Sequence, residues 1–168
     1  MPSTDVTLTV LAGYPGVGKS FVGREIAALE NAVMYSTDRI RKELTDGDPT
    51  YSSDESAATY NEMYSRARNT LQDGTSVILD ATFNLQEGRA RAETIADDRN
   101  VTYRLINVVC DDETTKQRIR SRDNISDADV AVYQGIKAGF DEFERDVITI
   151  DNSGEKTATQ AQLVELQS

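Results

Sequence analysis

Residues 13–20 read Gly-Tyr-Pro-Gly-Val-Gly-Lys-Ser and match the pattern G-x-x-x-x-G-K-[ST]. The residues before them, 7–12, are apolar and typical of a β-strand, and after them apolar residues recur on one face of an expected helix, at Phe21, Val22, Ile26 and Leu29. A glycine-rich loop between a strand and a helix points its backbone N–H groups at phosphate oxygens, and the helix N-terminus adds the positive end of a dipole. The alternative, a glycine-rich turn followed by a chance Lys-Ser, arises in roughly one chain of this size in a hundred or fewer.

Each residue type in this loop has an expected role. The lysine of such a loop, here Lys19, reaches the β- and γ-phosphates of ATP, and the hydroxyl, here of Ser20, ligates Mg²⁺. We therefore expect Lys19 to be catalytic and Ser20 to be a metal ligand. The residues expected to bind the nucleotide are Gly13, Pro15, Gly16, Val17, Gly18, Lys19 and Ser20.

Strand-like and helix-like segments alternate along the whole chain. Strands are expected at 7–12, 32–36, 77–80, 102–109 and 147–150, and helices at 19–30, 37–44, 56–72, 86–98, 113–122, 129–144 and 157–166. Continuous apolar strands suit a parallel sheet that is covered on both faces. The pattern predicts an α/β fold, a three-layer α/β/α sandwich around a parallel five-stranded sheet with right-handed crossovers. We expect a single domain over residues 1–168, with a lid at about 118–128.

The composition excludes several classes of protein. No apolar run approaches the ~20 residues of a membrane span, and the first residues lack the features of a signal peptide, so we expect a cytoplasmic protein without a membrane partner. Cys110 is the only cysteine, which rules out an internal disulfide. Because the chain has no histidine, any chemistry must use carboxylates, lysine, arginine and hydroxyls.

The net charge is −11, with thirteen arginines and five lysines. Such a surface is typical of proteins from salt-loving organisms, where salt screens self-repulsion, but also of ordinary acidic proteins. In either case the charge disfavours a protein that coats nucleic acid, because that function needs a basic footprint. A local basic cleft remains compatible with this negative net charge.

Carboxylates follow most of the expected strands, at the sheet edge where α/β proteins bind ligands. Strand 77–80 reads Val-Ile-Leu-Asp, a Walker B pattern, and Asp80 there can hold Mg²⁺ directly or through water, together with Ser20. The alternative role for Asp80 is a helix cap, for which Thr82 and Asn84 are also available.

Asp38 and Arg41 form a second candidate group at the start of the helix expected over 37–44. They are three residues apart and share a helix face. The carboxylate can accept a proton from a substrate hydroxyl while the arginine holds the acceptor or a phosphate. A carboxylate in the first turn of a helix also has a purely structural use as a cap.

Arg118 and Arg122 are four residues apart on one helix face, and Arg120 points elsewhere. The polar residues 123–127 follow them, which suggests a lid whose arginines offset the charge that develops on transferred phosphate. The alternative is a solvated helix face paired with Glu113 and nearby aspartates.

Together these motifs resemble the P-loop kinases, and in particular the kinase domains of polynucleotide 5′-hydroxyl kinases and the predicted kinases often labelled AAA-family ATPases. The resemblance covers residues 6–154 in order: the loop at 13–20, Ser-Thr-Asp-Arg-Ile-Arg-Lys-Glu-Leu at 36–44, Ile-Leu-Asp-Ala-Thr at 78–82, Arg-x-x-x-Arg at 118–122 with Ser-Asp-Ala-Asp at 126–129, and Phe-Asp-Glu-Phe-Glu at 140–144. The loop is specific to P-loop NTPases. The remaining motifs are specific to the kinase group but name no substrate.

The resemblance implies roles for single residues. Asp38 matches the carboxylate that activates the acceptor hydroxyl, and Arg41 matches the arginine that binds the acceptor's phosphate. Arg118 and Arg122 match lid arginines that grip the donor phosphates, and Asp80 matches the strand-end aspartate near the metal.

Two weaker matches and one departure complete the comparison. Asn152, in the Asp-Asn-Ser stretch at 151–153, resembles a residue of the loop that borders the adenine, and Arg89 resembles an arginine on the substrate side. Many relatives have a threonine after the Ser of the loop, where it contacts the α-phosphate, whereas Phe21 stands there in this chain. One nucleotide contact is therefore expected to be missing.

The expected activity is a kinase that needs ATP and Mg²⁺ and transfers the γ-phosphoryl group to a hydroxyl acceptor, either a polynucleotide 5′-end or a small metabolite. The acidic surface favours a small molecule, whereas the Asp38/Arg41 pair favours an acceptor that carries a phosphate. The alternative is a nucleotide-dependent ATPase or switch that acts on a protein partner, although the chain lacks the helical second domain of ring ATPases. The sequence does not determine the oligomeric state.

Overall fold

The computed structural model of the chain describes residues 5–121 and 127–167, and at 127–130 it describes the backbone alone. Five strands form one sheet in the order β2-β3-β1-β4-β5, and every neighbouring pair is parallel. The strands are β1 (Thr7–Ala12), β2 (Val33–Ser36), β3 (Val77–Asp80), β4 (Thr102–Val109) and β5 (Ile148–Asp151). The predicted five-stranded parallel sheet is confirmed.

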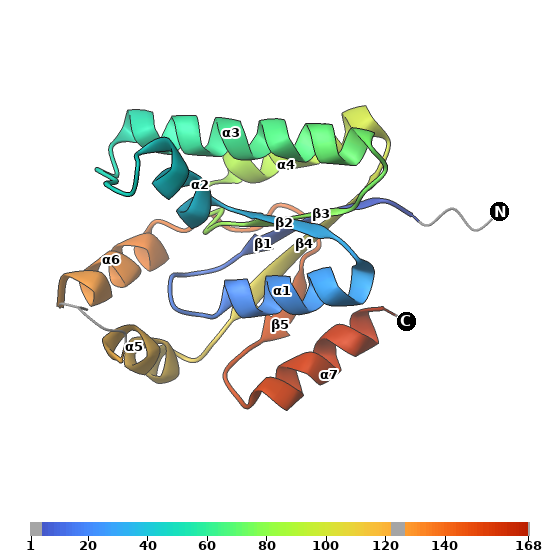
Figure 1. Ribbon diagram of the computed structural model, residues 1–168. Coiled ribbons are helices and arrows are strands. Elements are labelled where there is room, and N and C mark those ends of the chain that lie inside the picture. Colours follow the sequence, from blue (N-terminus) through green and yellow to red (C-terminus); the bar gives the residue numbers. More distant parts are fainter. Residues whose placement is uncertain (1–4, 122–126, 168) are drawn as a thin grey trace.

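Helices cover both faces of this sheet (Figure 1). On one face lie α1 (Lys19–Glu30) and α7 (Lys156–Leu166), and on the other lie α3 (Ser53–Gln72) and α4 (Gln86–Arg99). Three further helices stand near the carboxyl ends of the strands: α2 (Thr37–Leu44), α5 (Asp112–Arg120) and α6 (Asp127–Ala138). The three-layer α/β/α sandwich is therefore confirmed.

The core has two halves, one on each side of the sheet, because successive strand residues point to opposite faces. Leu8 and Val10 of β1 pack in the half that lies under α3 and α4, whereas Leu11 packs with α1 and α7. All three side chains are fully buried. Burial of each such side chain contributes about 1.5–3 kcal/mol, so the central strands fix the position of their carboxyl ends firmly.

The helix expected over 129–144 is much shorter in the structure, where α6 ends at Ala138 and residues 139–146 form a loop. The apolar spacing of Phe140 and Phe143 has another cause, because their rings lie over the Arg89 guanidinium at 5.0 and 4.2 Å. Arg89 also donates hydrogen bonds to the backbone carbonyls of this loop. Packing against α4 thus holds this segment in a loop, although its local sequence pattern is helical.

Four helices, α3, α5, α6 and α7, start one to three residues earlier than predicted, and two of these starts have a side-chain cap. The helix α3 begins three residues earlier, at Ser53, since the Ser52 hydroxyl accepts a hydrogen bond from the Glu55 N–H at 3.1 Å. The helix α5 begins one residue earlier, at Asp112, and the Asp111 carboxylate accepts from the Thr114 N–H at 2.8 Å.

Candidate active site

The loop at residues 13–20 joins β1 to α1 and takes a shape that only glycine permits at two points. Gly16 and Gly18 have φ of +85° and +91°, in the left-handed region. A Cβ on Gly16 would lie 2.8 Å from the Ile119 side chain of α5, and one on Gly18 would meet the Asn152 amide. The loop is therefore held between α1, α5 and the end of β5, and Gly18 is the N-cap residue of α1.

Ser20 and Asp80 meet at the mouth of this loop. The Ser20 hydroxyl donates to Asp80 Oδ2 at 2.8 Å, although the two residues are sixty positions apart. Burial raises the pKa of the Asp80 carboxyl above its ordinary value, and the Lys19 ammonium and the Ser20 hydroxyl oppose that shift. The negative charge of Asp38 raises the pKa further, so Asp38 is also close.

The pair of a hydroxyl and a buried carboxylate suits a hard cation such as Mg²⁺, which prefers oxygen ligands and keeps several waters. Within residues 5–121 and 127–167, no group of three or more His, Cys, Asp or Glu side chains could hold a metal ion. A cation bound at Ser20 and Asp80 would therefore complete its shell with nucleotide phosphates and water, as magnesium commonly does. The donor set fits Mg²⁺ that arrives with ATP.

A cleft of about 570 Å³ brings most of the predicted site residues together. Its volume lies within the range of ordinary ligand sites. The glycine-rich loop forms one wall, the start of α2 and residues of α3 form another, and the β3–α4 loop and α6 complete it. Of the residues predicted from the sequence, those that line it are Pro15, Gly16, Gly18, Lys19, Ser20, Asp38, Arg41 and Asp80.

Asp38 lies in the first turn of α2 and is exposed to the cleft. The cap of α2 is Ser36, and no side-chain hydrogen bond caps this helix. Asp38 therefore does not cap α2, but it is a carboxylate in the first turn of the helix, which is the other structural role expected for it. Its carboxylate faces the same cavity as Lys19 and Ser20.

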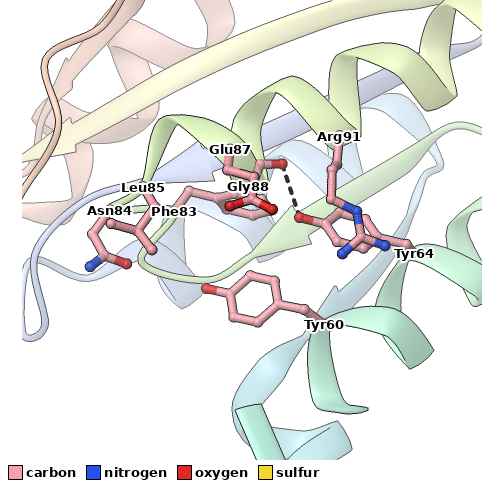
Figure 2. Close-up of a pocket in the computed structure, with 8 residues that line it drawn as sticks. All are labelled: Tyr60, Tyr64, Phe83, Asn84, Leu85, Glu87, Gly88 and Arg91. Atoms are coloured by element: carbon pink, nitrogen blue, oxygen red, sulfur yellow. Dashed lines mark hydrogen bonds between the residues drawn. The ribbon is translucent and has the colours of Figure 1, made fainter. Parts of the chain in front are cut away.

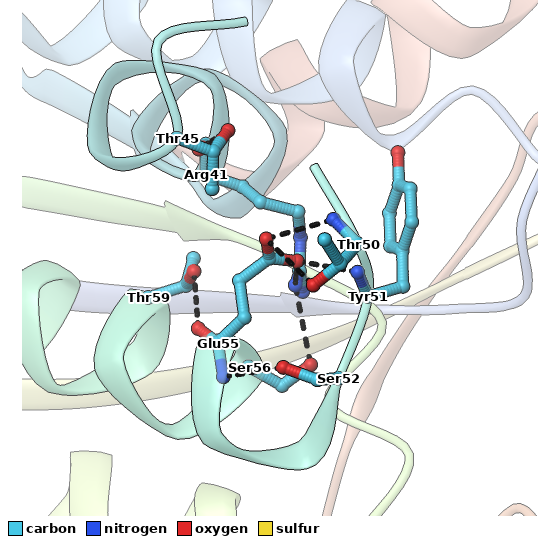
Figure 3. Close-up of polar contacts among 8 residues, drawn as sticks. All are labelled: Arg41, Thr45, Thr50, Tyr51, Ser52, Glu55, Ser56 and Thr59. Carbon is cyan, nitrogen blue, oxygen red and sulfur yellow. Dashed lines mark hydrogen bonds and ion pairs between the residues drawn. The ribbon is translucent and has the colours of Figure 1, made fainter. Parts of the chain in front are cut away.

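Arg41 is almost buried, and its guanidinium is held by α3 (Figure 3). Its Nη1 donates to Glu55 Oε2 at 3.0 Å and to the Ser56 hydroxyl at 3.2 Å, and the Tyr51 ring lies 4.9 Å from the guanidinium carbon. Glu55 also accepts from the backbone N–H groups of Thr50 and Tyr51. The backbone hydrogen bond from Thr50, with smaller contributions from Arg41, holds the pKa of Glu55 below its ordinary value.

Sequence analysis missed Glu55, which fixes both Arg41 and the loop before α3. The Ser52–Glu55 spacing is a capping signal, but it does not reveal a partner fourteen positions away. The consequence is chemical, because the charge of Arg41 is already matched by a carboxylate before any acceptor binds.

Arg118 and Asn152 support the glycine-rich loop from outside the cleft. Arg118 Nη2 donates to the Asn152 carbonyl at 2.8 Å, and its Nη1 donates to the Val17 carbonyl at 3.4 Å. Asn152 Nδ2 donates to the same Val17 carbonyl at 2.8 Å, and its Oδ1 accepts from the Thr159 hydroxyl at 2.7 Å.

These contacts change the interpretation of two predicted residues, Asn152 and Val17. The Asn152 side chain is buried and both ends of its amide are used, so the structure gives it a supporting role and does not support the expected adenine contact. The Val17 side chain is fully buried, and its backbone carbonyl accepts the hydrogen bonds from Arg118 and Asn152. Arg122 and most of the predicted lid, 118–128, lie outside the residues whose side chains are described.

Arg89 does not reach the cleft, contrary to the expectation of a substrate-side arginine. It is 2% exposed, and its guanidinium donates to the carbonyls of Phe83 at 2.7 Å, Asp141 at 2.8 Å and Glu142 at 3.2 Å. Burial lowers its pKa, and Asp141 opposes that shift. Arg89 belongs to α4 and forms hydrogen bonds with the loop after α6, so its role is structural.

None of the helices in the described residues is long and apolar enough to cross a membrane. The family model described as "AAA domain" matches residues 8–143 of the chain. An uncharacterized protein of Mycobacterium tuberculosis is 38% identical over 104 residues, which are 55% of this chain and 21% of that protein. The chain thus spans about a fifth of the length of this curated relative.

Two solved structures share the fold over nearly the whole chain. The APS kinase CysC of Mycobacterium tuberculosis, in complex with AMPPNP and APS, superposes with a TM-score of 0.71 at 17% identity and covers 97% of this chain and 96% of its own. A gluconokinase from Sinorhizobium meliloti superposes with a TM-score of 0.69 at 16% identity and covers 95% and 93%. At these identities the likeness is one of fold.

Proposed function

Because the chain belongs to the AAA domain family and has the fold seen in P-loop kinases, we propose that it is a kinase that uses ATP and Mg²⁺ and transfers the γ-phosphoryl group to a hydroxyl of an acceptor. One observation carries this proposal. A single cleft holds both the phosphate-binding residues and an exposed carboxylate, Asp38, that no cap hydrogen bond engages.

The donor side of the cleft would hold the triphosphate. The backbone N–H groups of the loop and the Lys19 ammonium would bind its oxygens, and Ser20 and Asp80 would hold Mg²⁺. The ion would neutralise charge on the β- and γ-phosphates. Arg118 would act as a positioning residue, since it holds the Val17 and Asn152 carbonyls on the outer side of the loop.

The acceptor side of the cleft would bring a hydroxyl to the γ-phosphorus. The acceptor oxygen forms a bond to phosphorus, the bond from phosphorus to the β,γ-bridging oxygen breaks, and ADP leaves with that oxygen. The proton of the hydroxyl passes to Asp38. Positioning and fixed charges would supply most of the acceleration, as in other phosphoryl transfers.

The test measures phosphoryl transfer and ATP hydrolysis separately. Lys19→Ala should weaken Mg·ATP binding by about tenfold or more, because it removes the cation that contacts the phosphates. Asp38→Asn keeps size but cannot take a proton, so transfer should fall by about 10²–10⁴-fold with Mg·ATP binding retained. Asp46→Asn is the matched control, in an exposed turn with φ of +53° that Asn tolerates.

Two results would contradict the proposal. Mg·ATP binding by Lys19→Ala that equals that of the unaltered chain would overturn the nucleotide site. Full acceptor phosphorylation by Asp38→Asn would overturn the role of the base. ATP turnover without any acceptor as the main activity, insensitive to Asp38→Asn, would instead assign an ATPase or switch that acts on a protein partner.

A further inference from the structure

A second cavity of about 150 Å³ opens beside the cleft, between α3 and the start of α4 (Figure 2). Its lining residues are Tyr60, Tyr64, Phe83, Asn84, Leu85, Glu87, Gly88 and Arg91. Three of them, Tyr60, Asn84 and Leu85, also line the main cleft, so the two spaces are adjacent. We call this second cavity the aromatic side pocket.

The walls of the aromatic side pocket are rings whose polar groups are largely used elsewhere. The rings of Tyr60 and Phe83 meet edge to face at 5.7 Å, and the Tyr64 ring lies 6.1 Å from that of Tyr60. The Tyr64 hydroxyl donates to the Gly88 carbonyl at 2.9 Å. What remains toward the cavity is mainly apolar, and an apolar cavity of about 150 Å³ accommodates one benzene-sized ring.

The glycine at position 88 keeps this space open. A Cβ there would lie 3.4 Å from the Tyr64 hydroxyl and 3.7 Å from the Phe83 ring, and any longer side chain would enter the pocket. Glycine inside a helix costs about 0.8–1 kcal/mol relative to alanine. Gly88 lies in α4 and has no left-handed φ, so the backbone does not require glycine here. The open volume is what its small size provides.

The cations near the pocket are already engaged. Arg41 is paired with Glu55 at 3.0 Å, and Arg91 donates to Asn61 Oδ1 at 3.0 Å while its guanidinium lies 4.5 Å from the Tyr64 ring centre. Glu87 adds a negative charge to the wall. A phosphate on the acceptor would need cations to spare, and this side of the cleft instead presents carboxylates.

The mouth of the main cleft is apolar as well. Tyr51, Leu85 and Val132 are 68%, 54% and 56% exposed, and all three line the cleft. Exposed large apolar side chains that gather at one opening mark a binding surface for an apolar group. They would cover a ring or an alkyl group better than a charged chain.

We propose that the acceptor is an uncharged small-molecule alcohol with one flat ring, that the ring occupies the aromatic side pocket, and that the hydroxyl lies in the cleft at Asp38. This inference rests on the proposed kinase function. The hydroxyl oxygen takes the γ-phosphoryl group of ATP, ADP leaves, and Asp38 takes the proton. A polynucleotide 5′-end is disfavoured, because it brings phosphates to a wall where Arg41 is already paired with Glu55 and Glu87 adds a negative charge.

The experiment compares acceptors and fills the pocket. Thymidine and benzyl alcohol serve as neutral ring-bearing probes, glycerol as a ring-free alcohol, and thymidine 3′-monophosphate and a 5′-hydroxyl oligonucleotide as phosphate-bearing probes. Transfer from γ-labelled ATP is measured for each. We expect kcat/KM for the better neutral ring probe to exceed that of every other class by about tenfold or more, the discrimination that a well-fitted apolar pocket provides.

Gly88→Leu should then raise the KM of that probe by about tenfold or more, because its side chain fills the pocket. It should fold, since leucine is the better helix former, and Gly88→Ala should give a smaller effect of the same sign. Ala90→Leu, on the exposed side of the same helix, is the matched control and should change KM by less than about twofold, as expected of a surface substitution.

The two proposals fail differently. If Mg·ATP does not bind and no probe of any class is phosphorylated, the kinase function is wrong. If transfer occurs but glycerol or a phosphate-bearing probe is the best acceptor, the kinase function stands and the acceptor class is wrong. A Gly88→Leu chain that phosphorylates the ring probe with unchanged KM would overturn the pocket.

Discussion

Asn152 and Thr159 form a buried hydrogen bond beneath the glycine-rich loop. This bond allows a test of whether Asn152 supports the loop or contacts the nucleotide. Thr159→Val keeps the shape of a fully buried side chain but leaves Asn152 Oδ1 without its donor at 2.7 Å. An unsatisfied buried acceptor costs about 1–3 kcal/mol. For a chain of this size each kcal/mol lowers Tm by about 2–4 °C, so a fall of about 2–12 °C is expected.

Asn152→Ala should cost more, about 2–4 kcal/mol, because it also removes a hydrogen bond to Val17 and leaves a cavity. The Val17 carbonyl would keep only the longer contact from Arg118, at 3.4 Å. If Asn152 supports the loop, both variants weaken Mg·ATP binding, and the double variant loses less than the sum of the two since the sites share one interaction. Calorimetric titration and thermal unfolding measure these effects.

A different pattern would refute this reasoning. If Asn152 contacts the nucleotide, as the sequence resemblance implies, Asn152→Ala should weaken Mg·ATP binding with little change in Tm. Thr159→Val should then leave Mg·ATP binding unchanged, because the Thr159 side chain is fully buried and does not line the cleft.

Two further predictions concern charge in the cleft. Because burial raises the pKa of Asp80, its ionised form opposes folding at neutral pH. Asp80→Asn should therefore raise the Tm of the nucleotide-free chain at pH 7 and lose the Mg²⁺-dependent gain in ATP affinity. Its stabilising effect should disappear as pH falls below 3.8, where the carboxyl of the unaltered chain is protonated in both states. A nucleotide-free Tm that falls at pH 7 would contradict this. Arg118→Ala should lower Tm and raise the KM for ATP, since it removes hydrogen bonds to the Val17 carbonyl of the loop and to the Asn152 carbonyl. Arg120→Ala, on an exposed position, should change neither. A loss of about 10²-fold in kcat with unchanged KM would instead show that Arg118 acts on the transferred phosphate, as the sequence predicts.

The sheet and the donor side of the cleft follow from local sequence signals. The strands Val77–Asp80 and Thr102–Val109 have the predicted bounds. In the first of them an apolar run ends at the carboxylate of Asp80. In a parallel sheet the carboxyl ends of such strands lie at one edge. That rule brings Asp80 to Ser20, and the structure has them in a hydrogen bond.

The remaining features depend on partners that are distant in the chain. The resemblance assigned Arg89 to the substrate side, but three backbone carbonyls and two aromatic rings bury it. Asn152 lies next to the loop only because β5 pairs with β4 at the sheet edge. The partner of Arg41 comes from α3, through the packing of α2 on that helix. No local pattern encodes these contacts.

The charges in the cleft give a physical reason why a divalent cation would bind together with the triphosphate. Burial chiefly raises the pKa of Asp80 and the negative charge of Asp38 raises it further, and the net charge of −11 adds to the repulsion of a triphosphate. The attraction that remains comes from Lys19 and from backbone N–H dipoles of the loop, which carry no formal charge. A divalent cation would convert Asp80 from a repulsive group into a ligand. The proposed donor site therefore suits Mg·ATP, whereas the acceptor side, where Arg41 is already paired with Glu55, offers less compensation to a second phosphate.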